Sequence, residues 1–298
     1  MYLAPMRRLL ACALLAAATF ARADVAGTRP AYSDRVPGQA PNAGAIRARM
    51  WAPEIDLGFV PQGVTVAGDS VLLSAYNGEG GSPRCRLYRI ERRTLVPTGR
   101  FDLPPSCAHA GGLAYAGGAR LFVADTGYLF EVDLARAFDA AHAAHAVVRA
   151  LSLRFPLRGS FLAYRDRALW IGEYAQPEAG RILRFPLDLI DAAPQPAELR
   201  EEQASASLAI APRSQGASFD RDGFLWLSQS SSQFGRLQKI DPKSGKVLAS
   251  YETMAGIEDL GFDSDGLLWA VSEAGSKRWN NWPTYFPILF SLDVQALR

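Results

Sequence analysis

The chain has 298 residues, of which 49% are apolar, enough to build a buried core, and its 32 basic and 30 acidic side chains give a formal net charge of +2 at pH 7. Lys and Arg are scattered without a basic run, so the sequence has no electrostatic footprint for nucleic acid. Beyond the first 23 residues no apolar stretch is long enough to cross a bilayer. We therefore expect a globular protein, acting as a monomer, with no nucleic-acid partner and no membrane span.

Residues Met1–Ala23 have the organisation of a secretory signal peptide. Arg7 and Arg8 form the charged start, Leu9–Phe20 the apolar stretch, and Ala21–Ala23 the small-x-small cleavage site. Cleavage there removes three arginines and no acid, which leaves 29 basic and 30 acidic side chains and a net charge near −1. The sequence thus predicts a periplasmic or secreted protein.

Residues 24–44 are rich in Pro, Gly, Ala and polar side chains without an apolar period, and we expect a flexible leader there. Residues 45–298 are expected to form one domain. Their first segment, IRARMWAPEI at Ile46–Ile55, has strand character. Because an unpaired sheet edge invites aggregation, we expect this strand to return, pair with the last part of the chain and close the fold.

A repeat of about 49 residues runs through the domain, and each copy contains a polar patch, an apolar strand, a turn and a second apolar strand. A strand repeat of this length is typical of a β-propeller blade. The sequence predicts an all-β propeller in which five blades are favoured and six are possible. The copies begin at Gln62, Gly111, Ser160, Gln215 and Glu258.

Matched positions of the second strands hold large apolar residues, among them Trp170, Trp226 and Trp269, and we expect these to pack between blades. The segments DRDG at Asp220–Gly223 and DSDG at Asp263–Gly266 resemble the start of a calcium loop. They lack the ligands that follow in such loops, so tight hairpin turns are the better interpretation.

Cys85 and Cys107 are the two cysteines that follow the signal peptide. An exported chain meets an oxidising compartment, and we expect these two to form a disulfide. The alternative is a thiol site, but the spacing is not CxxC.

In a propeller, the loops that precede the inner strands and the loops that follow the second strands open on one face around the channel. We call this the channel face. Its positions are mostly polar and carry no Lys or Arg, so we expect an acidic, oxygen-rich bowl. The candidate catalytic residues, which are also the candidate metal ligands, are Glu258, Asp259 and Glu273. The candidate substrate-binding residues are Gln62, Asn77, His109, Asp125, Glu173, Gln215, Trp279 and Trp282.

Three interpretations of these acids stay open. Crowding of Glu258, Asp259 and Glu273 raises at least one pKa and suits acid–base chemistry. Oxygen ligands of this kind also suit a divalent cation, with calcium the most plausible. The third interpretation is that the side chains only satisfy loop backbone and line a wet channel.

An unusual number of aromatic residues lies in the loop AGSKRWNNWPTYFP near the end of the chain. If exposed, Trp279, Trp282, Tyr285 and Phe286 form a stacking surface for a small molecule, a glycan or a peptide side chain. Alternatively, they tuck under the loop as a local core.

The segment PRSQGASFDRDGFLWLSQSSSQFGRLQKIDPKSGKVL resembles a repeat of the NHL and YncE-like propellers and of the senescence-marker/gluconolactonase family. Resemblance to the last family implies a divalent metal on the channel axis, held by Glu, Asn and Asp, and hydrolysis of lactones or phosphoesters. In this chain PQG at Pro61–Gly63 stands where that family has EGP. A second resemblance is to the plant-type glutaminyl cyclotransferases, which are five-bladed and exported. Their TQGL opening is similar to PQGV, and EDL at Glu258–Leu260 is similar to their NELE element.

Three functional hypotheses follow from these features. The first is an exported, metal-assisted hydrolase of the lactonase or esterase kind, with Glu258, Asp259 or Glu273 as base or ligand and with Gln62 and Gln215 orienting the substrate. The second is a non-catalytic propeller that binds a glycan, a peptide or a protein. The third is a glutaminyl cyclotransferase-like enzyme.

Overall fold

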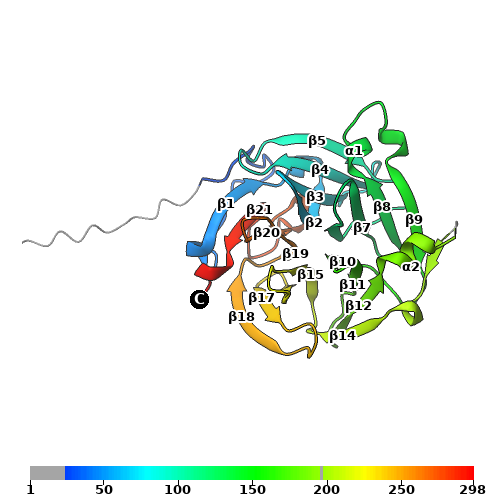
Figure 1. Cartoon of the computed structure of the whole chain (residues 1–298). Coiled ribbons are helices and arrows are strands. Elements are labelled where there is room, and N and C mark those ends of the chain that lie inside the picture. The colour runs from blue at the N-terminus through cyan, green and yellow to red at the C-terminus, as the bar shows by residue number, and fades with distance from the viewer. Residues whose placement is uncertain (1–23, 195–196) are drawn as a thin grey trace, which may run out of the picture.

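The structure, a computed structural model, describes residues 24–194 and 197–298. Five small sheets stand in a ring around a channel and form a five-bladed β-propeller, with β10, β15 and β19 near the centre and β5, β9, β14 and β18 at the rim (Figure 1). The fold predicted from the repeat is confirmed. The predicted signal peptide, Met1–Ala23, lies outside the described residues.

The blades are numbered in chain order, and the strands of each are named from the channel outward. Blade one contains β2 (Phe59–Ala67), β3 (Ser70–Asn77), β4 (Cys85–Glu91) and β5 (Pro97–Asp102). Blade two contains β6 (Gly112–Tyr115), β7 (Arg120–Ala124), β8 (Tyr128–Asp133) and β9 (Val147–Leu153). Blade three contains β10 (Phe161–Arg165), β11 (Ala168–Gly172), β12 (Gly180–Pro186) and β14 (Ala206–Ile210). Blade four contains β15 (Ser214–Phe219), β16 (Leu225–Ser230), β17 (Gly235–Ile240) and β18 (Val247–Thr253). Blade five contains β19 (Ile257–Phe262), β20 (Leu267–Ser272), β21 (Ile288–Asp293) and β1 (Ile46–Trp51).

The ring is closed by β1, which supplies the outer strand of blade five. It pairs antiparallel with β21, so that Met50 lies opposite Leu289 and Trp51 opposite Ile288. The expected closure by an N-terminal strand is therefore confirmed. The chain then turns through a short 3₁₀ helix at Ile55–Leu57 and starts blade one.

In the part of the chain that the structure describes, two short α-helices and one extra strand lie outside the repeat. The helix α1 (Leu134–Ala137) joins β8 to β9, and α2 (Leu187–Ala192) follows β12. After α2 the chain forms β13 (Ala197–Leu199), which pairs parallel with β9 and gives blade two a fifth strand. Within the described residues, no helix is long and apolar enough to span a membrane.

The tryptophans of the second strands are buried between blades, as expected. Two of them also hold the hairpins that precede them: the indole N–H of Trp226 donates to Asp220 at 3.0 Å, and that of Trp269 donates to Asp263 at 2.9 Å. Each aspartate also accepts a backbone N–H from its own turn. The hairpin interpretation of DRDG and DSDG is confirmed, because these carboxylates are occupied in folding the turn.

The inner strands approach one another so closely that side chains are excluded at several positions, among them Gly112, Gly216 and Gly261. A Cβ placed on Gly112 of β6 would lie 2.4 Å from the Cα of Phe161, and one on Gly216 of β15 would lie 2.4 Å from the Cα of Asp259. Real Cβ atoms do not approach other atoms that closely. Glycine at these positions lets neighbouring blades touch backbone to backbone around the axis.

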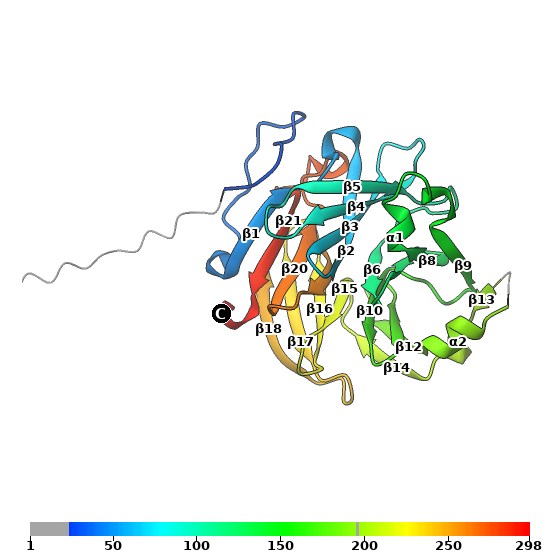
Figure 2. The ribbon, with the colours of Figure 1, turned by 45° about the horizontal axis from the view of Figure 1, so that its top comes forward.

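Residues 24–44, expected to be a flexible leader, run beside the outer edge of blade five (dark blue in Figure 2). Ala26 forms a parallel bridge with Met50 of β1, and its N–H donates to Arg49 O at 2.9 Å. This segment therefore makes ordered contacts with the propeller.

Candidate functional site

Glu273 follows β20 on the channel face and has only 8% of its surface exposed. Its Oε2 accepts a hydrogen bond from Gln62 Nε2 at 3.0 Å and another from the indole N–H of Trp279 at 2.8 Å. Burial raises the pKa of Glu273 to about 7, while the bonds from Trp279 and Gln62 and the positive charge of Arg278 act in the opposite direction. Near neutral pH this carboxyl group therefore exchanges its proton readily.

Glu258 lies in β19 and is 3% exposed. Its Oε1 accepts a hydrogen bond from Gln215 Nε2 at 3.1 Å. Burial, followed by repulsion from Glu273 and Asp259, raises the pKa of Glu258 well above its usual value, and the bond from Gln215 only partly offsets this. Burial and repulsion therefore favour the protonated form of Glu258, which lies near a second acid whose pKa is raised to about 7.

Asp259 is fully buried and is directed at backbone. Its Oδ2 accepts the N–H groups of Val64 at 3.1 Å and Leu113 at 2.9 Å, and its Oδ1 accepts the N–H of Ala217 at 3.4 Å. Burial raises the pKa of Asp259, and these backbone bonds counteract that rise. One side chain of blade five thus connects the inner strands of blades one, two and four, which is a structural role.

Around these acids stands a rim of aromatic rings and one guanidinium group. His109 stacks on Tyr76 with ring centroids 4.8 Å apart. Arg278 lies over the rings of both Tyr76, at 5.4 Å, and Trp279, at 4.8 Å. Burial lowers the pKa of His109, as do the charges of Arg278 and Arg84, so His109 is neutral at pH 7.

Arg278 brings a positive charge to the channel face, although the repeated positions themselves carry no Lys or Arg. It lies in the long loop after β20, outside the repeated positions that were aligned, and its charge acts on Glu273. The only sequence signal for it was its place directly before Trp279. Chain neighbours in an irregular loop do not show which way a side chain points, so this contact could not be predicted.

Asp125, which follows β7, is turned toward the loop that precedes β6. It is buried, and its Oδ1 accepts the N–H groups of Ala108 at 3.0 Å, His109 at 2.6 Å and Ala110 at 3.1 Å. These bonds hold Ala110 in a left-handed conformation with φ of 50°. Asp125 therefore supports the backbone that presents His109.

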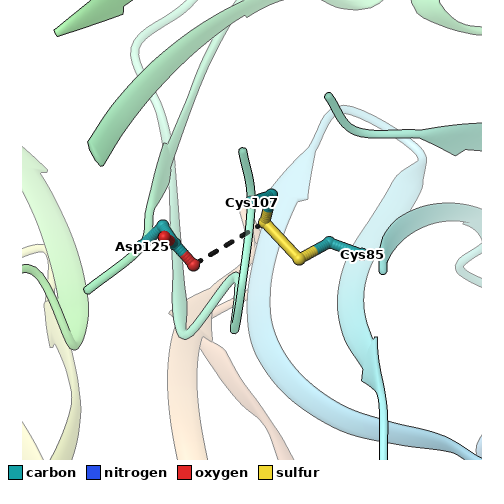
Figure 3. Close-up of side chains that lie close together, drawn as sticks. All are labelled: Cys85, Cys107 and Asp125. Atoms are coloured by element: carbon teal, nitrogen blue, oxygen red, sulfur yellow. Dashed lines mark hydrogen bonds between the residues drawn. A yellow bond between two sulfur atoms is a disulfide. The ribbon is translucent and has the colours of Figure 1, made fainter. Parts of the chain in front are cut away.

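The predicted disulfide between Cys85 and Cys107 is present, with Cα atoms 6.0 Å apart, and lies beside this loop. Cys107 Sγ is 3.7 Å from Asp125 Oδ1 (Figure 3). The disulfide thus joins β4 of blade one to the segment that leads into blade two.

Two other predicted substrate-binding residues have partners away from the acid pair. Asn77 Oδ1 accepts the N–H of Glu79 at 3.1 Å and shapes the loop after β3. Glu173 forms an ion pair with Arg181 of β12 at 3.0 Å. The structure brings together a smaller set than the sequence suggested, and its members are Gln62, Gln215, Glu258, Glu273 and Trp279.

Of the four aromatic residues in the loop after β20, two are buried as a local core and two are partly exposed. Tyr285 and Phe286 are buried in the core of blade five. Trp279 and Trp282 stack on each other, with ring centroids 4.9 Å apart, and both stay partly exposed. Of these four side chains, only Trp279 and Trp282 are exposed enough to contact a ligand.

The donor set does not fit a cation shared by Glu258, Asp259 and Glu273. In the described part of the chain, the one group of three possible ligand residues with atoms within 4.8 Å of one another is Cys85, Cys107 and Asp125. Two of these are joined in the disulfide, and a disulfide offers no thiolate. Asp259 moreover uses both oxygens on backbone N–H groups.

At least three cavities lie outside the channel, and two of them are larger than the third. One of these two, of about 580 Å³, lies between residues 35–41, blade four and the loop at residues 283–286. The other, of about 530 Å³, lies between residues 50–56 and the outer strands of blade one. Neither is lined by the acids of the channel face.

No protein-family model and no curated protein matches the sequence. Solved structures do match. The glutaminyl cyclase of Myxococcus xanthus aligns over 83% of this chain and 94% of its own, with 13% identity and a TM-score of 0.54. A luciferin-regenerating enzyme (80% and 92% covered, 10% identity) and a protein of unknown function from Bacteroides caccae (80% of each chain, 10% identity) both align with a TM-score of 0.48. At these identities the likeness extends to the fold, and the chain is a β-propeller.

Proposed function

We propose that the protein is an enzyme that hydrolyses or cyclises a small polar acyl substrate on the channel face, using Glu273 and Glu258 for proton transfer. The proposal rests on the pKa of Glu273, which burial raises to about 7. A carboxyl group whose pKa lies near the working pH both accepts and donates a proton readily, as general acid–base catalysis requires.

The two carboxyl groups would have different roles in the reaction. As ionised base, Glu273 takes a proton from the attacking nucleophile while that atom bonds to the acyl carbon. It then gives the proton to the leaving group as the bond between the acyl carbon and the leaving group breaks. Protonated Glu258 donates a hydrogen bond to the acyl oxygen, where negative charge develops. Gln62 and Gln215 hold the two carboxyl groups in place through their amide N–H groups.

Fold similarity suggests which substrate to test first. The protein from Myxococcus xanthus is a glutaminyl cyclase, so an N-terminal glutaminyl peptide is the first candidate. In its cyclisation the α-amino nitrogen is the nucleophile and ammonia leaves. Lactones and esters, in which water attacks and a hydroxyl group leaves, are the second class.

We also propose that the protein acts in the periplasm or after secretion. The disulfide supports this, because disulfides persist in oxidising compartments. The predicted signal peptide agrees with this location.

A second candidate function is non-catalytic binding of a glycan or peptide. The stacked and partly exposed pair of Trp279 and Trp282 favours it, since such rings bind sugar faces and apolar side chains. In that case the buried acids would only shape the pocket floor.

The test compares Glu273→Gln and Glu258→Gln with Glu202→Gln, a control at an exposed position. The probes are a Gln-initiated dipeptide with ammonia detection, glucono-lactone, 4-nitrophenyl acetate and 4-nitrophenyl glycosides. On the accepted probe, Glu273→Gln should lower kcat by about 10²- to 10⁴-fold, with KM little changed and the control unaffected. If wild-type protein turns over none of these probes, the binding function is the better account.

A further inference from the structure

Residues 29–35 pass over the loop that follows β20, and the guanidinium group of Arg35 contacts this loop at three points. Its Nη1 donates to Asn280 O at 2.8 Å and to Trp282 O at 2.9 Å, and its Nη2 donates to Pro283 O at 2.9 Å. In the part of the chain that the structure describes, no backbone N–H donates to these three carbonyls. Arg35 therefore supplies the hydrogen bonds that hold this turn.

The same segment is fixed by further contacts of Ala31, Tyr32 and Arg35. The Tyr32 hydroxyl donates to Gly275 O at 2.7 Å, at the start of the loop. Asp56 Oδ1 accepts the N–H of Ala31 at 2.8 Å. The Arg35 guanidinium also lies 4.9 Å from the centroid of the Tyr285 ring, at the end of the loop. Residues 29–35 thus bind the loop at its beginning, middle and end.

The loop held in this way carries part of the candidate site. The carbonyls that Arg35 binds belong to the turn that contains Trp279 and Trp282. Trp279 stacks on Trp282 and donates its indole N–H to Glu273 Oε2 at 2.8 Å. A continuous series of contacts therefore runs from Arg35 through the turn to Glu273.

We propose that Arg35 is a positioning residue, which fixes the loop at residues 275–286 so that the indole N–H of Trp279 reaches Glu273. Arginine suits this task because its planar fork directs several N–H groups at once, whereas the lysine ammonium is a point charge on a flexible stem. The importance of Glu273 rests on the proposed function. The contact itself is independent of turnover and can be tested separately.

The experiment measures hydrogen exchange at the indole N–H of Trp279 in protein carrying ¹⁵N-labelled tryptophan, with the resonance assigned by Trp279→Phe. Arg35→Ala should speed this exchange by about tenfold or more, and Arg35→Lys should speed it less. The matched control is Arg47→Ala, which removes an exposed ion pair with Asp293 and should leave the exchange unchanged. Should Arg35→Ala fail to fold, Tyr32→Phe removes one bond to the loop and should give a smaller increase.

Unchanged exchange at Trp279 in a folded Arg35 variant would overturn the proposal. Faster exchange supports it even if no substrate is turned over, so its outcome is separable from that of the proposed function. If the protein is an enzyme, kcat of Arg35→Ala should fall together with the loss of protection at Trp279, while kcat of Arg47→Ala stays at the wild-type level.

Discussion

The indole nitrogen of Trp279 lies 2.8 Å from Oε2 of Glu273 and donates a hydrogen bond to it from a loop six positions further along the chain. This bond favours the ionised carboxylate and opposes the effect of burial. It thereby lowers the pH at which Glu273 changes from acid to base.

Replacing Trp279 by Phe should raise the pKa of Glu273, because the ionised form loses one of its two donors while burial stays. An NMR titration of the Glu273 carboxyl carbon should show the midpoint moving upward, by about one pH unit for the loss of one hydrogen bond to a charged group. Trp282→Phe is the control, since it keeps an aromatic ring and removes no donor to Glu273. A midpoint that stays put in Trp279→Phe, or moves equally in both variants, would contradict this assignment.

The stability of the protein should fall as pH rises from about 4.5 to 7. Between these pH values Glu273 has lost its proton in the unfolded chain. In the folded protein, where its pKa is about 7, Glu273 still holds the proton. The free energy of unfolding should drop by about 3 kcal/mol from this group. His109 acts in the opposite direction, because burial lowers its pKa and the unfolded chain alone gains that proton below pH 6.5. The difference between wild type and Glu273→Gln, measured by urea unfolding from pH 4.5 to 8, gives the contribution of Glu273 together with its repulsion of Glu258. Parallel curves for the two proteins would show that Glu273 does not titrate in this range.

Asp259→Ala should destabilise the propeller strongly, because it leaves the buried N–H groups of Val64 and Leu113 without an acceptor. The expected loss is about 3 kcal/mol or more in the free energy of unfolding. Denaturant melts of the variant and of Asp222→Ala, an exposed control in the blade-four hairpin, check this. A loss below about 1 kcal/mol would show that Asp259 does not carry the inter-blade contacts.

Calcium should not stabilise the protein through the channel acids, since Glu258, Asp259 and Glu273 do not converge on one point. Thermal melts of EDTA-treated protein with and without added calcium should give the same Tm, and metal analysis should find no stoichiometric ion. A calcium-dependent rise in Tm that is lost in Glu258→Gln would restore the cation site expected from the sequence.

Replacing Cys85 and Cys107 together by Ser should lower the free energy of unfolding by about 3 kcal/mol in the chain-entropy treatment of a loop of this length. Because the disulfide lies beside the loop that presents His109, the variant should also lose protection of the amides at residues 107–110 in hydrogen exchange. A reduced wild-type protein should behave like the variant. An unchanged exchange pattern would mean that Asp125 alone holds this loop.

Much of the architecture could be predicted from the sequence, because equivalent positions in the blades are buried in the same way and therefore hold the same residue types. Alignment of the copies located Gln62, Gln215, Glu258 and Glu273, which do meet. It could not show that Asp125 binds the loop at residues 108–110, because a carboxylate that binds backbone N–H groups looks the same in sequence as one that faces a ligand. Arg35 and Arg278 were missed for a different reason, since their contacts depend on the paths of irregular segments that have no period.

The pairing of β1 with β21 also bears on how the protein reaches its native state. Arg47 and Asp293, which form an ion pair across this seam, are 246 positions apart. Blade five therefore cannot assemble until nearly the whole chain has been synthesised, and contacts of such sequence separation form slowly. Until β1 has paired with it, β21 has a free edge that accepts any strand of suitable sequence. At high concentration during refolding, β1 of one molecule can fill the gap in another, and the expected by-product is a strand-exchanged dimer or chain of rings.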